Sequence, residues 1–254
     1  MNGAARLQSD AAPDWRWPIA LAILAVGAIA GALIEGVGFE GAIWLHYLCK
    51  PAATGLIIAY AVRVRDAAEP RYRRWILAGL AFSLVGDICL MLPVDAFVAG
   101  LAAFLFAHLC YIAALWRGAR GPALFVCLLA MAAYAALNIV GLWPHLPATL
   151  RGAVIAYTCV LAAMAALALA RAVSLRARAG QPAWRAALGA LLFVASDSIL
   201  AWDRFAGHWP WAIAWVLATY YAAQWCIAGS IARSIAASMD RSVPAVSARE
   251  TGAG

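Results

Sequence analysis

The amino-acid sequence predicts an all-α fold, a polytopic transmembrane helix bundle of eight spans. Of its 254 residues, 66% are hydrophobic and only 12% are charged, whereas soluble domains have about 25% charged residues. The hydrophobic residues are collected in runs that are long enough to cross the ~30 Å hydrocarbon core of a bilayer as helices. The expected spans are residues 18–36, 42–62, 75–92, 96–117, 122–141, 150–172, 184–202 and 210–234.

These spans are expected to form a single integral membrane domain over residues 18–238. Residues 1–17 are polar and carry no pattern typical of a cleaved signal peptide, so we expect a cytoplasmic tail that leads into a retained helix. Residues 239–254 are small and polar, which predicts a disordered cytoplasmic tail.

Arginine side chains indicate the orientation of the bundle. Sixteen of them lie in the two tails and in the loops after the second, fourth and sixth spans, and only Arg151 and Arg204 lie in the opposite loops. The positive-inside rule therefore predicts that both termini are cytoplasmic. The net charge of +7 is scattered over short loops, which argues against nucleic acid as a partner. Arginine outnumbers lysine by 18 to 1 in this alanine-rich chain, a composition typical of GC-rich bacterial genomes, so we expect a bacterial inner membrane.

The two halves of the chain carry the same polar pattern. A shift of 110 positions sets Gly86-Asp87 in the third span against Ser196-Asp197 in the seventh. The same shift matches three residues of the first half, Gly79, Leu90 and Tyr111, with Gly189, Leu200 and Tyr221. With four spans in each half, both halves have the same orientation, which predicts two parallel four-helix repeats.

Three ionisable residues lie deep within the expected spans. A carboxyl group there costs at least ~2.5 kcal/mol on insertion scales, so we expect Asp87 and Asp197 to have a structural or functional role that offsets this cost. From the helical rise per residue, Asp87 is about 18 Å and Asp197 about 20 Å from the cytoplasmic face, and Lys50 is about 12 Å below the outer face. All three therefore come to one level in the bilayer. The residues expected to bind substrate or support the aspartates are Lys50, His108, Tyr111, Gln224, Tyr221, Ser83, Ser196, Tyr157 and Asn138.

A structural explanation competes with a functional one for these residues. A buried aspartate that faces a lysine is often only an ion pair that locks two helices together, but two aspartates share one lysine here, which favours a functional site. His108 fits core hydrogen bonding as well as a site. Ser83 and Ser196 are more typical of serines that bond a nearby carbonyl than of nucleophiles. The charged residues of the outer loops are expected to be solvated, namely Asp203, Arg204, His208, Glu35 and Glu40.

Five stretches of the chain carry a resemblance to a known family. They are Lys50-Pro51, GLAFSLVGDICLM around Asp87, GLAAFLFAHLCYI around His108, GALLFVASDSIL around Asp197 and YYAAQWCIAGS around Gln224. In this order they resemble the lysoplasmalogenase (YhhN-like) family of eight-span membrane proteins. The resemblance implies a lysophospholipid substrate, a lysoplasmalogen, whose vinyl-ether bond is hydrolysed to a fatty aldehyde and a glycerophospho-head-group. It also implies that the aspartates of the GD and SD motifs are the catalytic pair.

The same residues suit acid/base cleavage of a vinyl ether. Protonation of the outer alkene carbon needs an acid, and a negative charge stabilises the oxocarbenium ion that results. Two carboxyl groups in a low-dielectric site can supply both, and the sequence leaves open which of Asp87 and Asp197 is the acid. No metal or cofactor is expected, because the histidines and cysteines do not form a ligand cluster. Two other functions stay open, a small-molecule or lipid transporter with a buried Asp/Lys site and a non-catalytic lipid-binding membrane protein.

Overall fold

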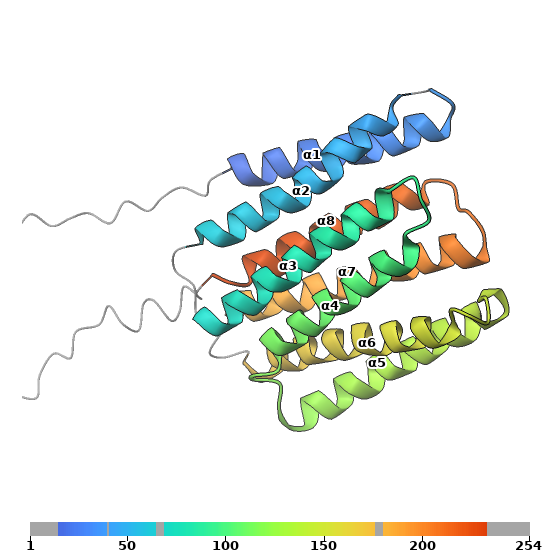
Figure 1. Ribbon diagram of the computed structural model, residues 1–254. Coiled ribbons are helices and arrows are strands. Elements are labelled where there is room, and N and C mark those ends of the chain that lie inside the picture. The colour runs from blue at the N-terminus through green and yellow to red at the C-terminus, as the bar shows by residue number, and fades with distance from the viewer. Residues whose placement is uncertain (1–14, 40, 65–68, 176–179, 233–254) are drawn as a thin grey trace, which may run out of the picture.

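The computed structural model describes residues 15–39, 41–64, 69–175 and 180–232, which form an all-α bundle as predicted (Figure 1). Its helices are α1 (Arg16–Gly36), α2 (Ile43–Arg63), α3 (Pro70–Met91), α4 (Phe97–Leu115), α5 (Gly121–Leu142), α6 (Arg151–Ser174), α7 (Gly180–Ala206) and α8 (Ala212–Gly229), with a 3₁₀ turn at Trp143–His145. Several predictions concern residues outside the described ranges, namely most of both tails, Glu40, Arg6, Arg65, Arg176, Arg178, Arg233, Arg241 and Arg249.

Seven of these helices, α1 to α7, are long and apolar enough to cross a membrane. The last helix, α8, has 18 residues and carries Thr219, Tyr220, Tyr221 and Gln224, which lower its hydropathy. The protein is therefore an integral membrane protein, and the eighth span stays a prediction.

Two helices extend beyond their predicted ends. Helix α3 begins at Pro70, before the predicted start at residue 75, because proline suits a first helical turn, where its missing N–H group is not needed. Helix α7 continues to Ala206, beyond the predicted end at residue 202. The apolar pattern stops there, but a basic residue such as Arg204 is favourable in a last helical turn. The expected outer loop therefore begins later, and Asp203 and Arg204 belong to the helix.

Neighbouring helices pair as hairpins, and packing is most extensive between α3 and α4 and between α7 and α8. Glycine permits the close approach in both pairs. A Cβ atom at Gly79 of α3 would lie 2.2 Å from the ring of Tyr111 on α4, and one at Gly189 of α7 would lie 2.8 Å from the backbone oxygen of Ala223 on α8. The two most tightly packed hairpins thus meet at glycines that the internal repeat matches with each other.

The α1–α2 and α5–α6 pairs lie on opposite sides of the other four helices (Figure 1). Helix α2 contacts α3 and α8, while α6 contacts α7 and α4. The outermost surface is apolar, with Phe125 and Leu137 of α5 70% and 74% exposed, as expected of helices that face lipid. The polar residues Lys50 and Thr54 of α2 and Tyr157 of α6 are buried instead. The fold therefore directs polar side chains from both outer pairs toward the central helices.

Candidate active site

Asp87 lies in α3 and is only 2% exposed. The Thr54 hydroxyl donates a hydrogen bond to its Oδ2 atom over 2.6 Å, and the Tyr220 hydroxyl donates to the same atom over 2.7 Å. The Lys50 ammonium stands 3.9 Å from Oδ1. Since hydroxyl and ammonium groups donate and a carboxylate only accepts, α2 and α8 together provide Asp87 with the partners that a carboxylate needs.

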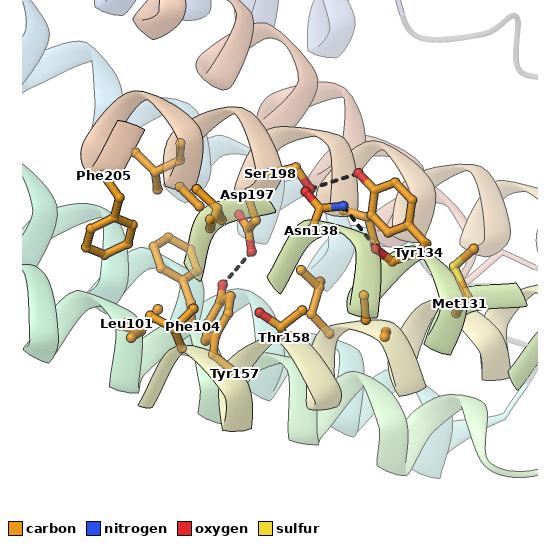
Figure 2. Close-up of a pocket in the computed structure, with 18 of the residues that line it drawn as sticks. Leu101, Phe104, Met131, Tyr134, Asn138, Tyr157, Thr158, Asp197, Ser198 and Phe205 are labelled. Carbon is orange, nitrogen blue, oxygen red and sulfur yellow. Dashed lines mark hydrogen bonds between the residues drawn. The ribbon is translucent and has the colours of Figure 1, made fainter. Parts of the chain in front are cut away.

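Asp197 lies in α7, with its side chain 12% exposed. The Tyr157 hydroxyl of α6 donates a hydrogen bond to its Oδ2 atom (Figure 2). The His108 Nε2 atom of α4 lies 3.0 Å from that hydroxyl and 3.4 Å from the same carboxyl oxygen. Both partners thus approach Oδ2, and no described residue donates a hydrogen bond to Oδ1. One oxygen of Asp197 is therefore held by neighbours while the other is left for a ligand or a proton.

The two aspartates are held by corresponding helices. Asp87 of α3 takes its partners from α2 and α8, and Asp197 of α7 takes its partners from α6 and α4. If α1–α4 are matched in order with α5–α8, then α3 corresponds to α7, α2 to α6 and α4 to α8, and one set of partner helices becomes the other. Each aspartate is thus contacted by a helix from its own half of the chain and a helix from the other half.

Both aspartates line one cavity of about 470 Å³, here named the polar cavity. Lys50 and His46 also line it, and it reaches the loops after α3 and α7, where Asp95 and His208 lie. The mixture of buried and loop residues indicates that this cavity connects the aspartates with the outside of the bundle. The two carboxyl groups therefore border the same space.

A second, smaller space of about 70 Å³, here named the apolar pocket, adjoins the polar cavity. It lies between α4, α5, α6 and α7 and is lined mostly by aliphatic and aromatic side chains, including Leu101 and Phe205 (Figure 2). Asp197 and Phe104 line both spaces. Asp197 therefore stands at the junction of a polar and an apolar compartment, which is the arrangement that an amphipathic ligand requires.

Two other residues predicted from the sequence, Ser196 and Asn138, lie at the edges of the two spaces. Ser196 lines the polar cavity, and its hydroxyl donates to the backbone oxygen of Val216 over 3.0 Å. Asn138 lines the apolar pocket, where its Oδ1 atom accepts a hydrogen bond of 3.2 Å from the Trp202 indole and its Nδ2 atom donates to the backbone oxygen of Tyr134. Both side chains are therefore held by structural hydrogen bonds at the edge of the site.

A separate buried cluster contains Ser83, Tyr111 and Gln224. The Tyr111 hydroxyl donates to Gln224 Oε1 over 2.8 Å and lies 3.4 Å from the Ser83 hydroxyl. Tyr221 is joined to Lys50 only through the backbone, since its hydroxyl donates to the Lys50 carbonyl over 3.4 Å. None of these residues, apart from Lys50, lines either cavity. They connect α3, α4, α8 and α2 without meeting the space in which a ligand would lie.

Sequence reasoning missed Tyr220 and Phe193, and did not include Thr54 in the site. Tyr220 was passed over because the repeat matches Tyr111 with its neighbour Tyr221. The missed residues stand four positions from site residues, Thr54 after Lys50, Phe193 before Asp197 and Tyr220 before Gln224, a spacing that brings side chains to one helical face. Phe193 is fully buried, and its ring contacts the rings of Phe104, His108 and Tyr220. It thus packs between the partners of the two aspartates.

Arg204 and His208 are exposed as expected, with side chains 44% and 90% exposed, and together with Asp203 they also line the polar cavity. The Arg204 guanidinium donates to Asp95 Oδ2 over 2.9 Å, which joins the end of α7 to the loop between α3 and α4. The longer α7 carries Asp203 and Arg204 in its last turn, which places these two charges at the edge of the cavity. Glu35 has a structural contact instead, accepting a hydrogen bond of 3.0 Å from the Ile43 backbone.

Known proteins are similar to this chain over most of its length. The YhhN family model matches residues 45–231. The lysoplasmalogenase TMEM86B of Sus scrofa is 41% identical over 188 residues, which cover 73% of this chain and 74% of the relative. A lysoplasmalogenase of Mycobacterium tuberculosis is 37% identical over 186 residues, which cover 70% of this chain and 66% of the relative. No solved structure matches the chain. Since the family model matches most of the chain, over a range that holds both aspartates and all their partners, this chain belongs to the YhhN family.

Proposed function

We propose that this protein is an intramembrane hydrolase that cleaves the vinyl-ether bond of lysoplasmalogen-type lysophospholipids, releasing a fatty aldehyde and the glycerophospho-head-group. Relatives named lysoplasmalogenase align with most of the chain. The observation that carries the proposal is that Asp87, which is buried, and Asp197, which is half-buried, come from different halves of the chain and line one cavity. Two carboxyl groups in one cavity, one protonated and one ionised, are what proton-catalysed cleavage requires.

The reaction begins with transfer of a proton to the outer carbon of the vinyl ether. The ether oxygen then shares its electrons with the neighbouring carbon, which gives an oxocarbenium ion. Water adds to that carbon and loses a proton, and the resulting hemiacetal breaks its bond to the glycerol oxygen. One water molecule is consumed, the glycerol oxygen leaves as a hydroxyl group, and the former alkenyl chain leaves as an aldehyde.

We assign the general acid to Asp197 and the stabilising negative charge to Asp87. Asp197 is the aspartate at the junction of the two compartments, and its Oδ1 atom accepts no hydrogen bond from the described residues. Asp87 accepts two hydroxyl hydrogen bonds and faces the Lys50 ammonium, partners that suit a carboxylate. Tyr157 and His108 would hold the Asp197 carboxyl group in one orientation and return a proton to it after each turnover.

The lipid would lie across the junction, with the first carbons of its alkenyl chain in the apolar pocket and its glycerol in the polar cavity. This places the vinyl ether beside Asp197 and leaves the water and the developing positive charge on the side of Asp87. Phe193, which is fully buried between the partners of the two aspartates, would keep bulk water from the reacting carbon.

The arrangement in the membrane forms part of the proposal. α8 would be the eighth span, since it pairs with α7 as extensively as α4 does with α3, and its polar residues Tyr220 and Gln224 are buried. The matching contacts of α2 and α6 support two parallel four-helix repeats within one domain over residues 18–238. Both tails would be cytoplasmic and the host membrane a bacterial inner membrane, as the arginine distribution and composition favour.

The test is release of aldehyde from a synthetic lysoplasmalogen by the purified protein in lipid nanodiscs. Asp197→Asn should lower kcat by about 10²–10⁴-fold, the usual contribution of a general acid, and Asp87→Asn should also lower it. Glu35→Gln is the matched control, because it neutralises an outer-loop carboxyl group while leaving an oxygen to accept the Ile43 hydrogen bond. Full activity of Asp197→Asn would remove this residue from the mechanism, and passage of intact lipid without aldehyde would favour a transporter.

A further inference from the structure

The outer end of the polar cavity carries charges of both signs. Two acidic residues, Asp95 and Asp203, and two basic residues, Arg204 and His208, line it. Arg204 Nη2 stands 2.9 Å from Asp95 Oδ2, and His208 Nδ1 stands 3.5 Å from Asp203 Oδ2. These four residues are here named the charged rim. They line the same cavity as Asp87 and Asp197, so a ligand that binds there extends toward the reaction site.

The Arg204–Asp95 ion pair of the charged rim is open to exchange with a ligand. Side chains are 44% exposed for Arg204, 71% for Asp95 and 90% for His208, while that of Asp203 is 23% exposed and also accepts a hydrogen bond of 2.9 Å from the Trp209 backbone. Ion pairs this exposed contribute little to stability, because water screens them and the side chains lose freedom when they pair. A ligand that presents a positive and a negative group could therefore replace the internal pair with two pairs of its own at small cost.

Arg204 is oriented by packing as well as by charge. Its guanidinium lies over the ring of Phe97 at 5.0 Å, and that ring meets the ring of Phe205 at 5.7 Å. Phe97 lines both the polar cavity and the apolar pocket. The stem of Arg204 is thus held at the edge of the ligand space while its planar donor group stays accessible, which suits two-point recognition of a phosphate.

The spacing along α7 fits a lysophospholipid. Asp197 and Arg204 are seven residues apart, which is close to two turns and about 10 Å along the helix axis, so the two side chains share a face. A glycerol backbone and its phosphate ester, together with the long side chain of Arg204, can bridge that distance. A lipid with its vinyl ether at Asp197 therefore brings its phosphate to the charged rim.

We propose that the charged rim binds a zwitterionic phosphodiester head group, in which Arg204 pairs with the phosphate and Asp95 and Asp203 pair with the ammonium. This inference rests on the proposed lysoplasmalogenase function, because it concerns the other end of the same substrate. A head group with an amine satisfies both signs of charge at the rim. A head group without an amine leaves two carboxylates facing an anion, and it should bind more weakly.

The experiment compares three lipids with one alkenyl chain, bearing phosphoethanolamine, phosphocholine or phosphoglycerol, in the nanodisc assay. The wild type should show a KM about tenfold higher for phosphoglycerol, as expected when one charge-assisted contact becomes repulsive. Arg204→Gln should raise the KM for both zwitterionic lipids by about tenfold with little change in kcat, because the reacting groups are untouched. Asp95→Asn combined with Asp203→Asn should remove the discrimination against phosphoglycerol.

Arg151→Gln is the matched control, because Arg151 lies at the start of α6, stacks on the Trp143 ring at 4.5 Å and does not line the polar cavity. It should leave all three KM values unchanged. Equal KM values for the three lipids in the wild type, or an unchanged KM in Arg204→Gln, would overturn the head-group site while leaving the hydrolase intact.

Binding of saturated alkyl-ether lysolipids, which this reaction cannot cleave, separates the two proposals. If no lipid releases aldehyde, the hydrolase proposal fails, and the head-group site is then judged by these dissociation constants alone. Tighter binding of phosphocholine than of phosphoglycerol, lost in Arg204→Gln but kept in Arg151→Gln, supports the site. The same affinity for both lipids overturns it. Melting temperatures of each variant confirm that a lost affinity is not a lost fold.

Discussion

Replacing Gly79 by alanine tests the close contact between α3 and α4. An added Cβ atom would lie 2.2, 2.6 and 2.8 Å from three atoms of the Tyr111 ring, closer than folded proteins tolerate. Tyr111 is fully buried and its hydroxyl is bonded to Gln224, so the ring cannot swing away freely. Overpacking of this kind costs about 1–3 kcal/mol, and losing the Tyr111 hydrogen bond adds about 1 kcal/mol. We expect Gly79→Ala to lower the free energy of unfolding by roughly 2–4 kcal/mol.

Gly55→Ala provides the matched control within the same chain. Gly55 lies in α2, and its added Cβ atom would meet nothing within 4 Å. Alanine favours a helix over glycine by roughly 0.5–1 kcal/mol, so this variant should melt at or slightly above the wild-type temperature. Thermal unfolding followed by tryptophan fluorescence in one detergent compares the three proteins. The reasoning fails if Gly79→Ala melts together with Gly55→Ala.

Three further predictions concern the partners of the aspartates and the lipid chain. Tyr220→Phe should lower kcat about tenfold while Tyr221→Phe stays close to wild type, because the first hydroxyl donates to Asp87 and the second only to a backbone oxygen; equal rates for the two variants would contradict this. Lys50→Met should destabilise the protein by roughly 3–5 kcal/mol, because it leaves a buried carboxylate unpaired, and adding Asp87→Asn should restore much of the melting temperature; a double variant no more stable than the single one argues against the ion pair. Ala201→Phe should raise the KM for short-chain and long-chain lysoplasmalogens alike, since Ala201 lines the apolar pocket of about 70 Å³, which takes only the first carbons of the chain; an unchanged KM would show that the chain lies elsewhere.

Composition and periodicity were sufficient to predict the helices. The rise per residue of a helix was sufficient to predict that Lys50 and Asp87 come together. Depth along a helix follows from counting residues, so groups from different helices can be set at one level without knowing their rotation. The rotation of each helix about its own axis was harder to predict. Tyr220 and Tyr221 differ by one residue, hence by about 100° around α8, and only the packing of α8 against α3 decides which hydroxyl reaches Asp87.

The same limit explains the cluster of Ser83, Tyr111 and Gln224. Each of these residues shares a helical face with a predicted site residue, yet they meet one another away from the two cavities. A shared helical face predicts the direction in which side chains point. It does not predict the height along the helix at which a neighbouring helix makes contact. Hydropathy also failed at the end of α7, because the charges of Asp203 and Arg204 ended the apolar run while the helix itself continued to Ala206.

Because each aspartate takes a partner from the other half of the chain, catalytic turnover should depend on the contact between the two halves. Asp87 needs Tyr220 from the second half, and Asp197 needs His108 from the first. If α1–α4 slid against α5–α8, both carboxyl groups would lose a partner in the same movement. Two half-chains produced as separate polypeptides should accordingly be inert when alone and should regain turnover only when they assemble.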